Sequence, residues 1–407
     1  MTKLEYKHIT GGGITTPSGF TAGVAQAAIK KAGRYDLVLV VSQVQAAAAG
    51  VFTTNRFQAA PVRISQEHIR RGEARGFVVN SGCANACTGE KGMEDARGMA
   101  QAAAEVIGCA AGEILVASTG VIGVPLPMDR VLTGIREAGV NLAAANGKRA
   151  AQAIMTTDTF PKEAAIEFEL DGKKVKMGAM AKGSGMIHPN MATLLAFVTT
   201  DASVSAQCLQ KALTLANEES FNMVTVDGDT STNDCLMMLA NGLAGNKTID
   251  DEQSGSFAAL VQALQVVCTE LARMIAKDGE GATKLMEVQV VNAPTVGDAR
   301  KAARSIASSS LVKAALFGED ANWGRVVCAL GYSGAEFDPA LVDVYLGDLA
   351  VAKNGGGLVF DEELALKILQ EKTVVIKVDL KSGRANATAW GCDLTYDYVK
   401  INGEYRT

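Results

Sequence analysis

Runs rich in valine and isoleucine alternate along the chain with runs in which hydrophobic residues recur at helical spacing. The first kind predicts β-strands, bounded by glycine or charged turns, at 36–42, 76–82, 113–119, 165–170, 175–180, 284–292 and 342–347. The second kind predicts amphipathic helices over 94–108, 128–139, 205–220, 254–281 and 297–318. Both kinds of element occur in both halves of the chain.

The end of the chain has a stronger β pattern than the rest. Segments 373–380, 385–390 and 394–401 read as strands separated by turns such as 381–384, and together they predict a meander. We therefore predict a mixed α/β fold, with helices packed on β-sheets in a layered α-β-β-α sandwich and a β-rich C-terminal region. No linker rich in proline or serine divides the chain, and segment 181–201 joins its two halves.

Composition places the chain among globular proteins. Its 407 residues, 48% hydrophobic and 20% charged, predict two or three folding units, each with a core of its own. The formal net charge is -5 and no basic run is present, which argues against nucleic-acid partners. The scattered cysteines, eight in all, indicate reduced, buried thiols. No signal peptide, transit peptide or membrane-spanning run is visible, so we expect a soluble, cytoplasmic protein without a membrane partner.

Several common catalytic motifs are missing from the chain. It has only three histidines and lacks the H-E-x-x-H, G-x-S-x-G, C-x-x-C and P-loop patterns. Acyl chemistry without a histidine base needs another nucleophile and base, and an N-terminal threonine supplies both, because its own α-amine can take the hydroxyl proton.

Segment 181–201 has the composition for creating such a threonine. Gly183, Gly185 and Pro189 precede a hydrophobic run that predicts a strand, and they can hold the intervening peptide out of its relaxed shape. If the Thr193 hydroxyl attacks the Ala192 carbonyl, the peptide becomes an ester that water opens, leaving Thr193 with a free amine. From the residues alone, an ordinary loop entering a buried strand, with Thr193 as a β-branched filler, is the favoured explanation of this segment.

Nine motifs together resemble the glutamate N-acetyltransferase (ornithine acetyltransferase) family of arginine biosynthesis. They cover nearly the whole chain in family order, at 21–42, 48–62, 80–89, 116–129, 154–162, 182–201, 221–234, 278–284 and 317–325. The resemblance implies a precursor that cleaves itself between Ala192 and Thr193. It divides the chain into an α chain, 1–192, and a β chain, 193–407, which remain associated, commonly as α2β2.

The resemblance also implies the catalytic residues and the reaction. Thr193 matches the nucleophile, which takes acetyl from N2-acetyl-L-ornithine as an ester and passes it to L-glutamate in a ping-pong sequence. Thr119 and Gly120 match the oxyanion hole, where a hydroxyl and a backbone N–H are fixed in advance of the charge that they stabilise. No metal or organic cofactor is expected, and the sequence leaves open whether acetyl-CoA is a second acetyl donor.

Five further residues match the substrate contacts of the family. Thr156 and Lys182 precede the cleavage site, and the lysine can pair with the carboxylate that ornithine and glutamate share. Glu280 suits the amino end of ornithine, and Asn402 and Thr407 match contacts at the end of the chain. The small-molecule partners expected are therefore N2-acetylornithine and glutamate.

Two other functions remain open at this point. An N-terminal-threonine amidase or peptidase would use the same nucleophile with water as the acceptor. A non-enzymatic small-molecule binding protein would keep an intact chain.

Other motifs point to structure: we interpret Asp227, Asp229 and Asp234 as a hydrogen-bonded turn, Cys83 and Cys87 as buried thiols, and His188 as a residue that holds its loop.

Overall fold

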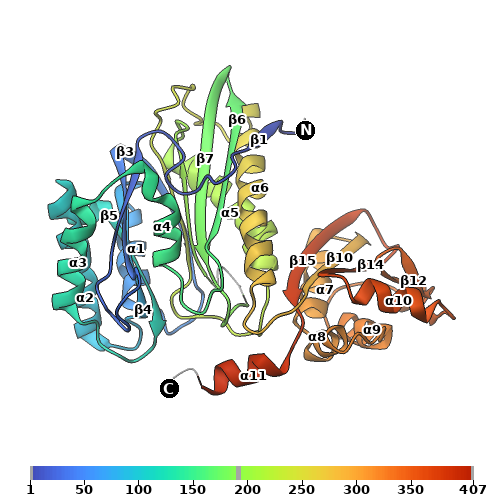
Figure 1. Cartoon of the computed structure of the whole chain (residues 1–407). Coiled ribbons are helices and arrows are strands. Elements are labelled where there is room, and N and C mark those ends of the chain that lie inside the picture. The colour runs from blue at the N-terminus through green and yellow to red at the C-terminus, as the bar shows by residue number, and fades with distance from the viewer. Residues whose placement is uncertain (1–2, 189–193, 405–407) are drawn as a thin grey trace. The chain divides into compact units, whose positions relative to one another are not determined.

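The computed structural model describes residues 3–188 and 194–404 (Figure 1). The chain forms two compact units. The first comprises Met1–Gly183, Asn190–Phe221 and Thr230–Leu271, and the second comprises Ser184–Pro189, Asn222–Asp229 and Ala272–Thr407. These are units of folding, and the predicted α and β chains, which depend on cleavage, remain a prediction.

Within the described residues, nine strands of the first unit form one sheet in the order β1-β6-β7-β8-β9-β3-β4-β5, with β2 paired to β3. The strands are β1 (Tyr6–His8), β2 (Phe20–Ala25), β3 (Leu37–Phe52), β4 (Glu73–Cys83), β5 (Ile114–Val121), β6 (Lys162–Leu170), β7 (Lys173–Lys182), β8 (Leu195–Thr200) and β9 (Cys235–Ala240). The helices are α1 (Ala60–Ile69), α2 (Gly89–Ile107), α3 (Met128–Val140), α4 (Gly147–Ala153), α5 (Ala206–Glu219) and α6 (Gly255–Lys277), of which α6 continues into the second unit.

The long strand β3 folds this sheet into two facing layers. Its first part, Leu37–Val41, pairs with β4 and its last part, Ala47–Phe52, pairs with β9, with a register shift to β4 between Val41 and Ala46. The rings of Phe77 on β4 and Phe197 on β8 meet across the layers at 5.1 Å, and both side chains are fully buried. Hydrophobic side chains from both layers fill the space between them.

Helices cover the outer faces of both layers, as Figure 1 shows. Helices α1, α2 and α3 form one hydrophobic cluster with the outward residues of β3, β4 and β5. On the other side, α5 packs against β3, and α6 runs beside β1, where the Gln262 side chain accepts the Leu4 N–H at 2.8 Å. The predicted α-β-β-α sandwich is confirmed.

Among the described residues, one helix, α6, is long and apolar enough to cross a membrane, with a mean hydropathy of 1.4. Its fully buried residues recur every three or four positions, singly or in adjacent pairs, along one face: Leu260, Ala263, Leu264, Val267, Cys268, Leu271, Ala272, Ile275 and Ala276. This periodicity is typical of a core helix with one solvent face.

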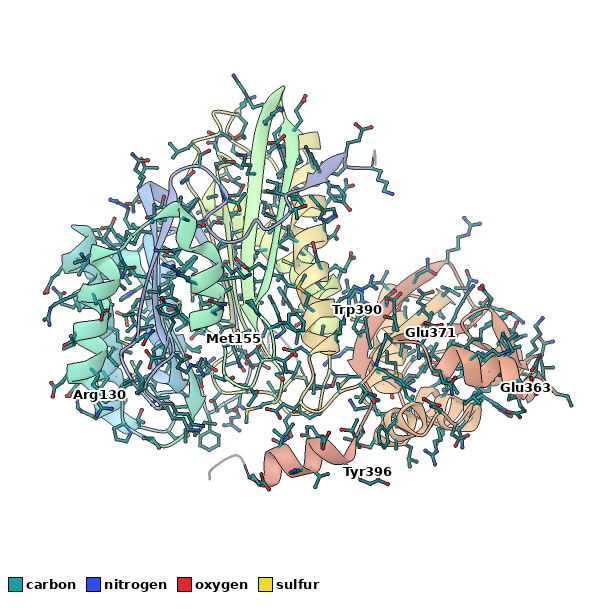
Figure 2. The ribbon with its side chains drawn as sticks, in the orientation of Figure 1. Arg130, Met155, Glu363, Glu371, Trp390 and Tyr396 are labelled. Carbon is teal, nitrogen blue, oxygen red and sulfur yellow. The ribbon has the colours of Figure 1, made fainter. Side chains whose placement is uncertain are left out.

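The second unit has a sheet of six strands within the described residues, in the order β13-β12-β11-β14-β10-β15. The strands are β10 (Leu285–Ala293), β11 (Asp343–Leu346), β12 (Leu349–Lys353), β13 (Gly356–Gly357), β14 (Thr373–Asp379) and β15 (Ala385–Cys392). The helices are α7 (Val296–Ser308), α8 (Ser310–Phe317), α9 (Trp323–Gly331), α10 (Glu362–Leu369) and α11 (Tyr396–Gly403). Trp390 on β15 donates to the Glu287 carboxylate of β10 at 3.1 Å (Figure 2).

Two predicted elements are wrong in detail. Segment 394–401, predicted as the last strand of a meander, forms helix α11, which begins where the Thr395 hydroxyl accepts the Tyr398 N–H. Tyr396 and Val399 of this helix are 84% and 68% exposed, so their β propensity finds no sheet to pack on. The predicted helix 297–318 is divided into α7 and α8 at Ser309, whose hydroxyl caps the second helix.

Candidate active site

One edge of the first unit gathers the ends of several strands. Lys182 at the end of β7 pairs with Leu195 at the start of β8, and Leu195 pairs with Cys235 at the start of β9. The Cys235 N–H also donates to the Leu194 carbonyl at 2.9 Å. Leu194 directly follows the predicted nucleophile. Ala192 and Thr193 themselves lie outside the described residues.

The predicted oxyanion residues lie at the end of β5. Thr119 pairs with Ser81, and Gly120 pairs with Gly82 of the parallel strand β4, where the register shifts. Gly120 has φ of 131°, and a Cβ there would lie 2.3 Å from the Gly82 carbonyl carbon, so the backbone requires glycine. The Thr119 hydroxyl has no hydrogen-bond partner among the residues that the structure describes, and it remains available to a ligand.

Asn233 connects the oxyanion residues to the start of β9. Its side-chain amide donates to the Ser118 carbonyl at 2.9 Å and to the Ala84 carbonyl at 2.6 Å. Ser118 directly precedes Thr119, and Asn233 is two residues before Cys235. This buried amide therefore holds the end of β5 beside the strand ends that include Lys182 and Leu195.

A buried cluster of charges surrounds the end of β7. The Asp158 carboxylate accepts from the Lys162 ammonium at 2.7 Å and from the Gly183 N–H at 2.7 Å, and it lies 3.9 Å from the Lys182 ammonium. Burial alone would raise the pKa of Asp158, but the charges of Lys182 and Lys162 lower it to about 2. Asp158 is therefore ionised at neutral pH.

Thr156 lies beside this cluster. Its N–H donates to Asp158 at 3.0 Å, and the preceding carbonyl, of Met155, accepts from the Arg34 guanidinium (Figure 2). The same guanidinium donates to the Ser81 hydroxyl at 3.4 Å, which ties this segment to the end of β4. Neither the Thr156 hydroxyl nor the Lys182 ammonium makes a hydrogen bond within the described part of the chain.

Asp234 is a second buried carboxyl near Lys182, and it differs from Asp158. Burial raises its pKa well above the usual value, against the lowering effects of the Ser231 hydrogen bonds and the Lys182 charge. Its Oδ2 atom has no hydrogen-bond partner among the described residues. Burial therefore favours the neutral form of Asp234, and Asp158 is the carboxylate that pairs with Lys162 and lies 3.9 Å from the Lys182 ammonium.

The second unit brings two other predicted substrate residues together. The Asn402 side chain on α11 donates to the Glu280 carboxylate at 2.9 Å, and the Glu280 N–H donates to the Ser184 carbonyl at 2.9 Å. A Cβ at Gly185 would lie 2.3 Å from a Glu280 carboxylate oxygen, so this close approach requires glycine. Thr407, the remaining predicted contact, lies outside the described residues.

Polar contacts also hold the chain that leads to the predicted cleavage site. Asp227 accepts the N–H groups of Met186 and Ile187 at 2.6 and 2.8 Å, and it also accepts the Asp229 N–H at 3.3 Å, which confirms its predicted turn role. The Arg304 guanidinium can only donate, so His188 accepts from it at Nε2 and donates from Nδ1 to the Thr225 hydroxyl at 3.0 Å. Burial, followed by the Arg304 charge, lowers the pKa of His188 and favours this neutral form. His188 therefore holds its segment, as predicted.

A correction concerns the two neighbouring cysteines. Cys83 is buried, but Cys87, predicted to be a buried thiol, is exposed, because it lies in the turn between β4 and α2 with φ of 56°. No group of three or more metal-binding side chains is found among the described residues.

Comparison with known proteins identifies the family. The model of the ArgJ family matches residues 21–407. The chain belongs to the ArgJ family. It is 60% identical to the arginine biosynthesis bifunctional protein ArgJ of Symbiobacterium thermophilum, over 97% of this chain and 99% of that one. It is 54% identical to the ArgJ protein of Caldanaerobacter subterraneus, over 98% of this chain and 100% of that one. The ornithine acetyltransferase of Mycobacterium tuberculosis, solved with ornithine, is 39% identical and covers 46% of this chain and 100% of its own, with a TM-score of 0.44.

Membership of the ArgJ family makes this chain an acetyltransferase of arginine biosynthesis. The non-enzymatic alternative is therefore not retained. Sequence reasoning about the site missed Asp158 and Lys162 and assigned Asp234 only to a turn. All three lie within or directly beside motifs that resemble the family. Their spacing gave no signal that the pKa values of Asp158 and Asp234 shift in opposite directions, because those shifts depend on burial and on the neighbouring lysines.

Proposed function

We propose that this member of the ArgJ family transfers acetyl from N2-acetyl-L-ornithine to L-glutamate, giving L-ornithine and N-acetyl-L-glutamate. Self-cleavage between Ala192 and Thr193 would first create the N-terminal threonine that carries the acetyl group. Family membership supports the acetyl transfer, and the resemblance of segment 182–201 supports the cleavage.

The observation that carries the proposal is the buried ammonium of Lys182. The lysine side chain is 9% exposed, and its ammonium makes no hydrogen bond within the described residues. A carboxylate that enters this position gains a charge-assisted hydrogen bond in a poorly solvated site. Acetylornithine and glutamate share an α-carboxylate, so one such position serves both halves of a ping-pong reaction.

The acyl steps follow from the proposed nucleophile. In cleavage, the Thr193 oxygen bonds to the Ala192 carbonyl carbon, the C–N bond breaks, and the nitrogen takes the proton that the hydroxyl loses. Water then hydrolyses the ester. In transfer, the freed amine takes the hydroxyl proton as the oxygen attacks the acetamide of acetylornithine, and the departing amine of ornithine receives a proton. In the second half of the reaction these steps run in reverse: the amine of glutamate attacks the acetyl ester, and the Thr193 oxygen leaves and regains its proton.

Thr119 and Gly120 would stabilise the negative oxygen of each tetrahedral intermediate. Among the described residues the Thr119 hydroxyl has no partner, and the glycine backbone at 120 is fixed by its pairing with Gly82. Removing one such donor typically costs about 2.7–4 kcal/mol of transition-state stabilisation. The Thr156 hydroxyl, which also has no partner in the described part of the chain, suits a polar group of the bound amino acid.

Glu280 would bind the side-chain ammonium of ornithine, with Asn402 orienting its carboxylate. Thr407 would complete the substrate contacts. The proposal includes an α2β2 assembly of the two cleaved chains, a cytoplasmic location, no metal or organic cofactor, and acetyl-CoA as an additional acetyl donor to glutamate.

The test combines intact mass, N-terminal sequencing and a transfer assay on purified protein. The parent should show a second N-terminus reading Thr-Leu-Leu-Ala, and Thr193→Ala should give a single full-length chain without turnover. Thr193→Ser, which keeps a hydroxyl, is the matched control and should still cleave. Active parent protein with one uncut chain would refute the proposal.

The same assay separates transfer from hydrolysis. With acetylornithine and glutamate both present, N-acetylglutamate should form faster than free acetate. Faster release of acetate would instead identify an N-terminal-threonine amidase, the alternative in which water is the acceptor.

A further inference from the structure

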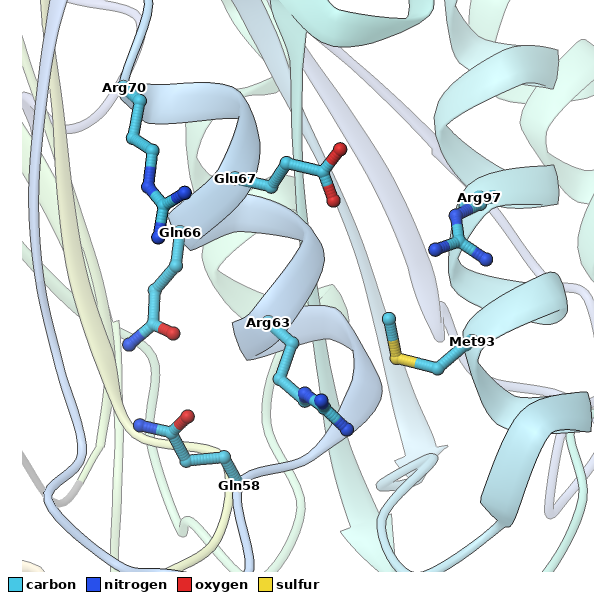
Figure 3. A pocket seen from close by; sticks show the side chains of 7 residues that line it. All are labelled: Gln58, Arg63, Gln66, Glu67, Arg70, Met93 and Arg97. Carbon is cyan, nitrogen blue, oxygen red and sulfur yellow. The ribbon is translucent and has the colours of Figure 1, made fainter.

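A groove on the outer face of the first unit lies between α1 and α2 (Figure 3). It has a volume of about 450 Å³. Four of its lining residues come from α1 or its end, two come from α2, and one precedes α1: Arg63, Gln66, Glu67, Arg70, Met93, Arg97 and Gln58.

The lining of this groove is rich in unpaired positive charge. Arg63, Arg70 and Arg97 line it with one carboxylate, that of Glu67, and none of the three guanidinium groups makes an ion pair or hydrogen bond within the described residues. A guanidinium presents several N–H groups in a planar fork that matches phosphate oxygens. The side-chain amides of Gln58 and Gln66 add neutral donors. The groove therefore suits a ligand with more than one phosphate group.

One end of the groove lies next to the candidate active site. The Gln58 side chain donates to the Thr53 carbonyl at 3.0 Å, and the N–H of the next residue, Ala59, donates to the Thr232 carbonyl at 2.9 Å. Thr232 directly precedes Asn233, whose amide holds Ser118 beside the predicted oxyanion residues. From this end, the ten residues of α1 extend about 15 Å towards Arg70.

We propose that the arginine groove binds the phosphate groups of an acetyl donor of the nucleotide-thioester class, of which acetyl-CoA is the example. The phosphates would lie along α1 while the acyl end passes Gln58 towards Thr119. This inference rests on the proposed function only in naming an acetyl donor as the ligand, because phosphate binding itself requires no turnover.

Isothermal titration of the purified, full-length protein at low ionic strength tests the groove with three probes: coenzyme A, pantetheine and inorganic pyrophosphate. Coenzyme A should bind at least tenfold more tightly than pantetheine, which lacks the phosphates. Its affinity should fall as salt is added, because exposed charges are screened.

Arg63→Gln and Arg97→Gln should each weaken coenzyme A binding about tenfold. Arg136→Gln, an exposed arginine on α3 outside the groove, is the matched control and should bind as the parent does.

Thermal unfolding of each variant checks that its fold is intact. Equal affinity for coenzyme A and pantetheine, absence of binding, or unchanged binding by both groove variants would overturn the proposal. Pyrophosphate binding as tight as that of coenzyme A would identify a site for free phosphates and would overturn the assignment to an acetyl donor. Protein that binds coenzyme A through Arg63 but transfers no acetyl group would refute the proposed function alone.

Discussion

Replacing Asp158 by asparagine removes a carboxylate that lies beside two buried lysines. Lys162 is fully buried and its ammonium lies 2.7 Å from Asp158, while the Lys182 ammonium is 3.9 Å away. An asparagine of nearly the same shape leaves the Lys162 charge without its counter-ion. Breaking a buried ion pair from one side typically costs about 3–5 kcal/mol, and we expect Asp158→Asn to destabilise the first unit by that amount.

The pKa of Asp158 gives a second, smaller value for the stabilisation that this carboxylate provides. Its fall from 3.8 to about 2 on folding corresponds to about 2 kcal/mol of stabilisation. Because the folded state has the lower pKa, this stabilisation is fully present above about pH 4 and is lost as the pH falls towards 2. The variant should lack this part of the acid dependence. The mutational cost is larger because the substitution also takes this counter-ion away from the buried Lys162 ammonium.

Hydrogen exchange followed by mass spectrometry is the suitable assay. Both tryptophans, Trp323 and Trp390, belong to the second unit, so their fluorescence reports the unfolding of that unit. Exchange in peptides of β6 and β7 reports the first unit directly. In Asp158→Asn these peptides should exchange faster by a factor of about 100 or more, whereas Asp250→Asn, at an exposed position of the same unit, should match the parent.

The double variant Asp158→Asn/Lys162→Met isolates the cause. It also removes the buried Lys162 charge and should recover part of the stability that Asp158→Asn loses, because the two residues are in contact. Strictly additive effects, or a single-variant loss below about 1 kcal/mol, would refute the view that Asp158 neutralises a buried lysine.

Three further outcomes are expected. Gly120→Ala should lose turnover and about 1–3 kcal/mol of stability from strain at φ of 131°; Gly331→Ala, with no atom within 4 Å of the new Cβ, should lose neither. Burial raises the pKa of Glu163 to about 7, so the stabilisation of the fold by protonated Glu163 is present below about pH 4.5 and is lost as the pH rises through 7. Glu163→Gln should remove this part of the pH dependence of the unfolding temperature. At pH 8 the variant should be more stable than the parent by about 1–2 kcal/mol, after allowance for partial exposure. Glu280→Gln should raise KM for acetylornithine about tenfold and KM for glutamate less, and equal rises would contradict an ornithine-side role.

Local sequence pattern predicted many elements of the first unit but missed α1, α4, β1, β2 and β9. Strands such as β4 and β5 carry continuous valine-rich runs because both of their faces are covered, and α2 and α3 show helical spacing because each has one solvent face. The pattern failed at segment 394–401, where a threonine cap and the absence of a neighbouring strand outweigh the β propensity of tyrosine and valine. Such an outcome depends on what the rest of the chain offers as a packing partner.

The chemical types of the candidate site are present in the sequence: a threonine and a glycine after a strand, lysines near a glycine-rich segment, and carboxylates that precede strands. Only the tertiary structure decided how they act. Asp158 and Asp234 are the same residue type, yet one is ionised between two lysines and the other is driven towards its neutral form. Charge state is set by burial and by neighbours that lie far away in the chain, and local pattern carries no record of either. The sequence determined which groups are available, and the fold determined their protonation and the partners that they face.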